Sequence, residues 1–193
     1  MSHLPQWRLW DGAPGMELTD ALLDLFSAHE RPIIAIDGPA GAGKTTLASH
    51  IHLALFPHYS SAIIHMDDLY AGWDNPLSPE LTEVLTHICQ SHKAGNEITI
   101  SKFDWASSSF LSPEKIDQVQ LLILEGVGSG QSAVREYLST LIWINIDEMS
   151  GLHRVLERDG ESIKDQMQTW LETQEQHFAS EKTDNAADFV LTT

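Results

Sequence analysis

The sequence predicts an α/β fold in which a mainly parallel five-stranded sheet lies between two layers of helices. Five short apolar runs alternate with amphipathic stretches along the chain, which is the pattern of strands joined by crossover helices. Residues 32–66 also have the length of one β-α-β unit. The five expected strands are residues 32–37, 62–66, 121–125, 141–146 and 187–191.

Length and composition fit one soluble domain over residues 1–193. Hydrophobic residues make up 42 % of the chain and charged residues 20 %, as in ordinary globular proteins. The net charge of −17 would repel a phosphate backbone, so we expect neither nucleic acid nor an anionic membrane as a partner. The single cysteine, Cys89, excludes an internal disulfide framework. We expect a cytoplasmic protein with no membrane span.

Helical spacing of apolar residues predicts the remaining elements. Residues 1–31 are expected to form an extended arm, with Trp7 and Trp10, followed by an amphipathic helix from Glu17 to His29. Ser78 and Pro79 have the residue types of a helix cap and first turn. Further helices are predicted over residues 44–56, 79–94, 149–159 and 163–178.

A phosphate-binding loop follows the first core strand. Residues 38–45, GPAGAGKT, fit the pattern G-x-x-x-x-G-K-[ST], with an apolar strand before them and a helix behind. Such a P-loop wraps backbone N–H groups around phosphates at a helix N-terminus. A plain glycine-rich turn is the alternative, and the filled positions in the right context favour phosphate. The predicted nucleotide-binding residues are Gly38, Ala40, Gly41, Ala42, Gly43, Lys44, Thr45 and Thr46.

Acidic residues follow two of the other predicted strands. Asp67 and Asp68 come directly after residues 62–66, at the strand end where ligands bind in open parallel sheets. One of them faces the phosphates, or both cap the strand end in solvent. Glu125 ends the next core strand, where a magnesium-associated acid is expected. With the Thr45 hydroxyl, Glu125 is the predicted Mg²⁺ site.

Two arginines and a long insertion complete the candidate site. Arg154 and Arg158 are four apart on one predicted helix face; they clamp transferring oxygens or form a solvated basic pair with Glu157 and Asp159. The insertion, residues 67–118, is expected to bind the acceptor, and residues 152–165 to form a short lid. The aromatic residues of the insertion either line that acceptor site or pack into the core: Tyr70, Trp73 and Trp105.

The motifs, taken together, resemble the branch of P-loop kinases that includes uridine kinase, pantothenate kinase and phosphoribulokinase. The matches are IAIDGPAGAGKTT, HMDDLY, FDW, LILEG, RVLERD and ADFVL, which occur in family order from residue 33 to residue 191. The resemblance implies a three-layer αβα P-loop NTPase fold with a short lid. FDWASSSF lacks the histidine and arginine that usually follow this motif in uridine kinases.

The resemblance also implies roles. Asp67 matches the acid that activates the acceptor hydroxyl, Asp104 matches an acid that holds acceptor hydroxyls, and Glu125 matches a magnesium-shell acid. Arg154 and Arg158 match lid arginines that stabilise the transferring phosphoryl group. Independently of the resemblance, Lys44 of the P-loop would reach the β- and γ-phosphates, and Tyr70 and Trp105 of the insertion are the candidate acceptor contacts.

We therefore expect an enzyme that uses ATP and Mg²⁺ to phosphorylate a hydroxyl of a small molecule. Residues 60–120 contain no arginine, which favours an uncharged acceptor such as a nucleoside over a phosphorylated one. A nucleoside monophosphate kinase and a regulatory ATPase remain alternatives, whereas a GTPase would need an Asn-Lys-x-Asp sequence that the chain lacks. The sequence leaves open the acceptor's identity, the choice of ATP or GTP, and assembly into a homo-oligomer.

Overall fold

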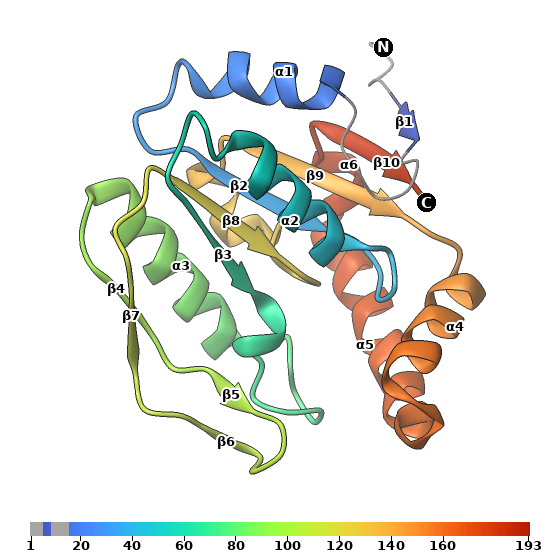
Figure 1. Ribbon diagram of the computed structural model, residues 1–193. Helices are drawn as coiled ribbons and strands as arrows, with labels where there is room; N and C mark the ends of the chain where they lie inside the picture. Colours follow the sequence, from blue (N-terminus) through green and yellow to red (C-terminus); the bar gives the residue numbers. More distant parts are fainter. Residues whose placement is uncertain (1–5, 9–15) are drawn as a thin grey trace.

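The computed structural model describes residues 6–8 and 16–193. Within them the central sheet has six strands, all parallel, in the order β1-β10-β9-β2-β8-β3 (Figure 1). The five predicted strands are all present, with small shifts at their ends, which confirms the α/β prediction. The strands are β1 (Gln6–Arg8), β2 (Ile33–Asp37), β3 (Ser61–His65), β8 (Leu121–Glu125), β9 (Thr140–Asn145) and β10 (Phe189–Thr192).

The sixth strand, β1, departs from the prediction of five. It pairs in parallel with β10, with Gln6 opposite Val190. A strand of three residues is too short to show a periodicity, so β1 could not be predicted from the sequence pattern. The rest of the predicted arm, residues 1–5 and 9–15, lies outside the described residues.

Helices cover both faces of the sheet. Helices α1 (Met16–Phe26) and α2 (Lys44–Leu55) pack on one face, and α3 (Pro79–Ala94) and α5 (Lys164–Glu181) pack on the other. Successive side chains of a strand point to opposite faces. Ile34 and Ile36 of β2 accordingly join the core under α1 and α2, whereas Ile33 joins the core under α3.

The insertion begins with a short 3₁₀ helix, η1 (Met66–Asp68). Helix α3 follows, with the Ser78 side chain accepting a hydrogen bond from the backbone N–H of Leu81 and with Gly95 in the left-handed region at its end, as the cap residues predict. Two small antiparallel pairs complete the insertion. They are β4 (Ile98–Ile100) with β7 (Glu114–Ile116) and β5 (Phe103–Asp104) with β6 (Ser109–Phe110).

The last part of the chain contains the residues predicted to form a lid and supplies the strands β9 and β10. Helix α4 (Glu148–Asp159) starts at the N-cap Asp147 and ends at Gly160. The predicted lid, residues 152–165, falls on the last two thirds of α4, the 3₁₀ helix η3 (Glu161–Ile163) and the start of α5. The other elements of this part are the 3₁₀ helix η2 (Ser132–Tyr137) and α6 (Thr183–Ala186).

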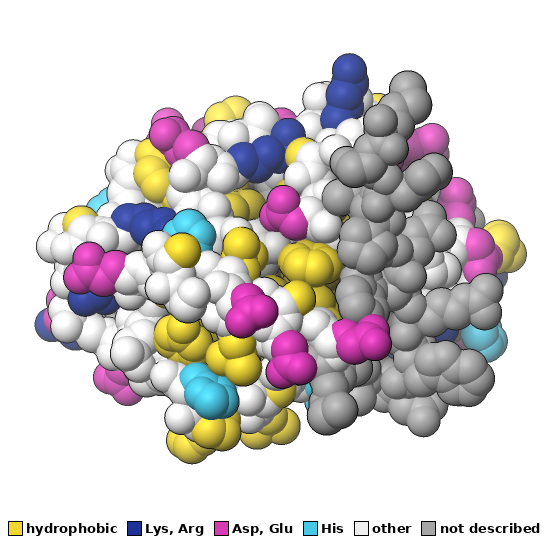
Figure 2. All heavy atoms as spheres, turned by 90° about the horizontal axis from the view of Figure 1, so that it is seen from above, with side chains coloured by type: hydrophobic (Ala, Val, Ile, Leu, Met, Phe, Trp, Pro, Cys, Tyr) yellow, Lys and Arg dark blue, Asp and Glu magenta, His cyan; other side chains and the backbone are white. Residues whose placement is uncertain are grey.

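Acidic and basic side chains are interspersed on the face that is seen from above in Figure 2. In the described part of the chain, no helix combines the length and the apolar character that a membrane crossing would require.

The strand order brings the candidate site residues to one edge of the sheet. Strand β8 lies between β2 and β3, and Glu125 at its end pairs with Ile36 on one side and His65 on the other. Because parallel strands end at the same edge, the P-loop after β2, Glu125 and the acids after β3 converge there.

Candidate active site

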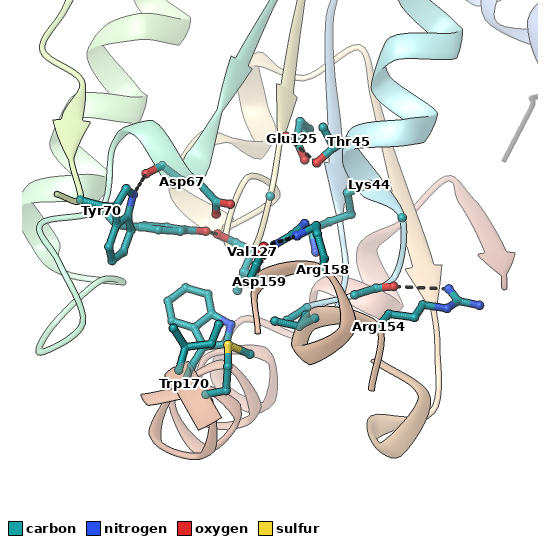
Figure 3. Close-up of a pocket in the computed structure, with 18 of the residues that line it drawn as sticks. Lys44, Thr45, Asp67, Tyr70, Glu125, Val127, Arg154, Arg158, Asp159 and Trp170 are labelled. Atoms are coloured by element: carbon teal, nitrogen blue, oxygen red, sulfur yellow. Dashed lines mark hydrogen bonds and ion pairs between the residues drawn. The ribbon is translucent and has the colours of Figure 1, made fainter. Parts of the chain in front are cut away.

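The P-loop joins β2 to α2 and forms one wall of a cavity of about 820 Å³ (Figure 3). Gly41 and Gly43 have φ angles of 77° and 90°, values that residues with a Cβ rarely adopt. Most of the predicted nucleotide-binding residues line the cavity: Ala40, Gly41, Gly43, Lys44, Thr45 and Thr46. Gly38 and Ala42 do not line it; Ala42 packs in the core, and a Cβ on Gly38 would come within 2.4 Å of the Ile144 carbonyl oxygen.

The Lys44 ammonium lies inside the loop. Its Nζ donates hydrogen bonds to the carbonyl oxygens of Gly38 and Pro39, both at 2.8 Å. Burial lowers the pKa of Lys44, and the nearby carboxylates of Asp37 and Glu125 oppose that shift. A bound phosphate would add a further negative partner for this cation.

Thr45 and Glu125 meet on the wall formed by β8. The Thr45 hydroxyl donates to Glu125 Oε1 at 3.1 Å, so two hard oxygen ligands stand side by side at the start of α2. Such oxygens suit Mg²⁺, which usually takes few protein ligands and fills the rest with water and phosphate oxygens. The residues present therefore fit a magnesium ion.

His65 is a site residue that the sequence reasoning missed. Its Nδ1 lies 2.5 Å from Glu125 Oε1, and this hydrogen bond raises the pKa of His65. The ring can hold the Glu125 carboxylate in place opposite Thr45. The available signal was the position of His65 at the end of β3, two residues before Asp67.

Asp67 and Asp68 point in different directions. Asp67 lines the cavity beside Tyr70 and Glu125, and Figure 3 shows its carboxylate directed toward Val127 and Arg158. Desolvation by the cavity walls and the negative charge of Glu125 raise the pKa of Asp67, whereas Lys44 and Arg158 lower it. Asp68 Oδ2 instead lies 3.7 Å from Lys102 Nζ on the insertion.

Helix α4 packs directly against the P-loop. A Cβ on Gly151 would come within 2.6 Å of the Ala40 carbonyl oxygen, and one on Gly41 within 2.3 Å of the Gly151 carbonyl oxygen. This contact of backbone with backbone requires a small residue on each side. It brings the next two turns of α4, with both arginines, over the cavity.

Arg154 and Arg158 both line the cavity but have different partners. Arg154 Nη1 donates to the Gly41 carbonyl oxygen at 3.3 Å and to Thr193 Oγ1 at 3.1 Å. The Arg158 guanidinium donates two hydrogen bonds to the Asp159 carboxylate, at 2.7 and 2.6 Å, and acts electrostatically on Lys44 and Asp67. Figure 3 shows Arg158 directed toward Lys44 and Arg154 lying on the far side of the loop.

The other end of the cavity is aromatic. We call it the aromatic end: Tyr70, Trp73, Trp105, Ile163, Met167 and Trp170. Tyr70 and Trp105 are thus at the cavity, as predicted for acceptor contacts, whereas Trp170 comes from α5 and was assigned only to a helix. Asp104, predicted to hold acceptor hydroxyls, does not line the cavity. Its carboxylate accepts from the Ala106 N–H and the Ser107 hydroxyl in the β5–β6 turn.

Asp37 is a buried acid that holds the P-loop in place through hydrogen bonds. This fully buried carboxylate ends β2 and accepts hydrogen bonds from the N–H groups of Gly38, Gly128 and Gly130. It thereby ties the P-loop to residues 126–130, which follow Glu125. Burial raises the pKa of Asp37 from 3.8 to about 6, against the lowering effect of these N–H groups and Lys44.

The raised pKa makes stability depend on pH. The folded state holds the proton of Asp37 more tightly than the unfolded chain, so this favourable contribution is present at low pH and is lost as pH rises through about 6. Asparagine mimics the neutral acid and removes this dependence. We expect the unfolding free energy of the wild type to fall, relative to that of Asp37→Asn, by about 2 kcal/mol between about pH 4.5 and 7.5.

Urea unfolding of both proteins at the two pH values measures this difference. Asp20→Asn, at an exposed position of α1, is the charge-matched control and should show a constant difference from the wild type. A constant difference for Asp37→Asn as well would contradict the assignment.

Comparison with known proteins identifies solved structures with a similar fold. No protein-family profile matches the chain, and no curated protein sequence does. Among solved structures, a protein from Bacillus stearothermophilus described as a possible uridine kinase aligns with a TM-score of 0.67 at 20 % identity, covering 91 % of this chain and 98 % of that one.

Two further solved structures have the same overall arrangement. A candidate fructose transport system kinase from Silicibacter sp. TM1040 has a TM-score of 0.67 at 17 % identity and covers 90 % of this chain and 97 % of its own. YFH7 from Saccharomyces cerevisiae, described as a candidate P-loop kinase with a circular permutation, has a TM-score of 0.54 at 14 % identity, with 95 % and 99 % covered. The chain therefore has the fold of the uridine kinase-like P-loop kinases.

Proposed function

We propose that the protein is an ATP-dependent kinase that transfers the γ-phosphoryl group to a hydroxyl of a small, uncharged acceptor. The observation that carries this proposal is the position of Asp67. Its carboxylate shares one cavity with the P-loop lysine, the Thr45–Glu125 pair and Arg158. The same cavity continues beyond the P-loop to the aromatic end, which leaves room for a second molecule beside Asp67.

The reaction requires positioning and charge stabilisation more than covalent chemistry. The acceptor oxygen attacks the γ-phosphorus, the bond from that phosphorus to the β–γ bridging oxygen breaks, and ADP leaves. Asp67 accepts the hydroxyl proton late in this transfer and passes it to solvent. Lys44 and Arg158 stabilise the negative charge on the transferring group and on the leaving oxygen.

Thr45 and Glu125 would hold Mg²⁺, which neutralises phosphate charge and helps to orient the β- and γ-oxygens when it is bound. His65 supports that role from the neighbouring strand, because its ring bonds to the Glu125 oxygen that accepts from Thr45. The chain thus contributes one hydroxyl and one carboxylate to the ion.

The distribution of cations supports an acceptor without a phosphate. Among the residues that line the cavity, the basic ones are Lys44, Arg154 and Arg158, which belong to the P-loop and α4. A nucleoside monophosphate would need a guanidinium or ammonium group at the acceptor end, where the lining is aromatic. The monophosphate kinase alternative therefore has less support than transfer to an alcohol.

ATP consumption in the presence of Mg²⁺ tests the proposal. ADP formation should be slow with ATP alone and rise at least about tenfold with an acceptor from a panel of alcohols, nucleosides, sugars and nucleoside monophosphates, as positioning of a second substrate requires. Acceptor-independent hydrolysis as the sole activity would contradict a kinase. Phosphorylation of a monophosphate alone would contradict the uncharged acceptor.

A further inference from the structure

The aromatic end of the cavity is a continuous wall of rings. The centroid of Trp73 lies 5.1 Å from that of Trp105 and 6.4 Å from that of Trp170, and Tyr70 lies 5.1 Å from Trp170. Ile163 and Met167 extend this wall along η3 and α5. These contacts connect the insertion to α5, so residues from both elements line the same cavity.

The polar atoms of two of these rings are already paired with the backbone. The Tyr70 hydroxyl donates to the Val127 carbonyl oxygen at 2.7 Å, and Trp105 Nε1 donates to the Asp67 carbonyl oxygen at 3.0 Å. Among the residues that line the cavity, no Asn, Gln, Ser or His side chain occurs, and both threonines belong to the start of α2. Apart from the indole N–H groups of Trp73 and Trp170, the aromatic end therefore offers apolar surface, with few side chains suited to a ring of hydroxyls or a nucleobase edge.

Asp104 does not supply the missing polar contact. Its carboxylate is engaged by Ala106 and Ser107 within its own turn, and these hydrogen bonds lower the pKa of Asp104. A sugar or ribose seated against the tryptophans would lose hydration of most of its hydroxyls and gain few hydrogen bonds in return, at a cost in affinity. An apolar ring would gain affinity from the same surface.

We propose that the acceptor is an alcohol whose hydroxyl sits on a short chain attached to an apolar ring, and that it is neither a sugar nor a nucleoside. The ring packs among Trp73, Trp105 and Trp170, and the hydroxyl reaches Asp67, whose backbone is bonded to Trp105. This assignment rests on the proposed kinase function, because Asp67 must face the reacting hydroxyl. The aromatic end selects this class of molecule.

Binding of simple probes tests the assignment without any need for turnover. Calorimetry would measure the affinity of 2-phenylethanol, indole-3-ethanol, uridine and ribose for the protein with Mg²⁺ and a non-hydrolysable ATP analogue. We expect the two ring alcohols to bind at least about tenfold more tightly than uridine and ribose, as an unpaired polar ligand is penalised. Equal or tighter binding of uridine or ribose would overturn the assignment.

Two variants locate the binding surface. Trp73→Ala should weaken 2-phenylethanol binding by about three- to tenfold, and Trp73→Phe should restore most of it, because an aromatic contact is lost and regained. Asp104→Ala, in the same insertion, should leave the affinity within about twofold, since its carboxylate does not reach the cavity. A large loss in Asp104→Ala would overturn the assignment even if Trp73→Ala failed to fold.

Transfer from ATP to the same probes separates this assignment from the kinase function. Preferential binding of the ring alcohols, with acceptor-independent hydrolysis as the sole activity across the full acceptor panel, would support the apolar pocket and contradict the kinase reaction. Faster phosphorylation of uridine or ribose than of the ring alcohols would support the kinase reaction and overturn the apolar acceptor.

Discussion

Asp67→Asn is expected to lower kcat by about a hundred- to a thousandfold and to leave ATP affinity within about twofold. The carboxylate faces the cavity beyond the P-loop and makes none of the loop's hydrogen bonds. Asparagine fills the same space but cannot accept the hydroxyl proton or orient the alcohol as an anion does. Steady-state kinetics with saturating ATP and acceptor, and a separate ATP titration by calorimetry, measure the two quantities.

Asp68→Asn is the matched control for this experiment. Asp68 has the same chemistry one residue further on, but its carboxylate lies near Lys102 on the insertion. An exposed pair of this kind contributes little, so turnover should stay within about twofold of the wild type. Near-normal turnover in Asp67→Asn, or an equal loss in Asp68→Asn, would remove Asp67 from the proposed mechanism.

The local parts of the site could be predicted from the sequence because neighbouring residues determine them. The strand, loop and helix around Lys44 have their signals within about one β-α unit, and the acids near the ends of β3 and β8 are placed by those strand ends. Figure 1 shows β2, β8 and β3 side by side, with β3 at the edge of the sheet. That adjacency is what turns residues far apart in the sequence into one cavity.

The parts that were missed depend on contacts across the chain or on competing local bonds. His65 meets Glu125 through strand register over 60 residues, and a single histidine at a strand end does not reveal that pairing. The Asp104 carboxylate accepts a hydrogen bond from Ser107, three residues further along the chain, because an aspartate in a turn bonds readily to nearby donors. The sequence did not decide whether the tryptophans line the cavity or pack in the core, because this depends on the long-range contact of Trp170 on α5 with Trp73.

Arg158→Ala should reduce kcat by about a thousandfold, whereas Arg154→Ala should chiefly raise the KM for ATP, by about three- to tenfold. Their spacing of four residues on one helix predicts the same role for both arginines, but their hydrogen-bond partners in the structure differ. Arg158 acts on Lys44, Asp67 and Glu125 and is held by Asp159. Arg154 bonds to Gly41 of the P-loop and to Thr193, which follows β10, where it would contact a nucleotide held by the loop.

Arg158→Lys sharpens this prediction, because lysine keeps the charge but loses the planar fork that binds two oxygens at once. We expect it to recover part of the lost kcat and to leave the KM for ATP near the wild-type value. Initial rates over a matrix of ATP and acceptor concentrations separate the two constants for each variant. Equal losses of kcat in Arg154→Ala and Arg158→Ala would mean that both guanidinium groups reach the transferring phosphoryl group, which would require α4 to move relative to the P-loop contact at Gly41 and Gly151 when substrates bind.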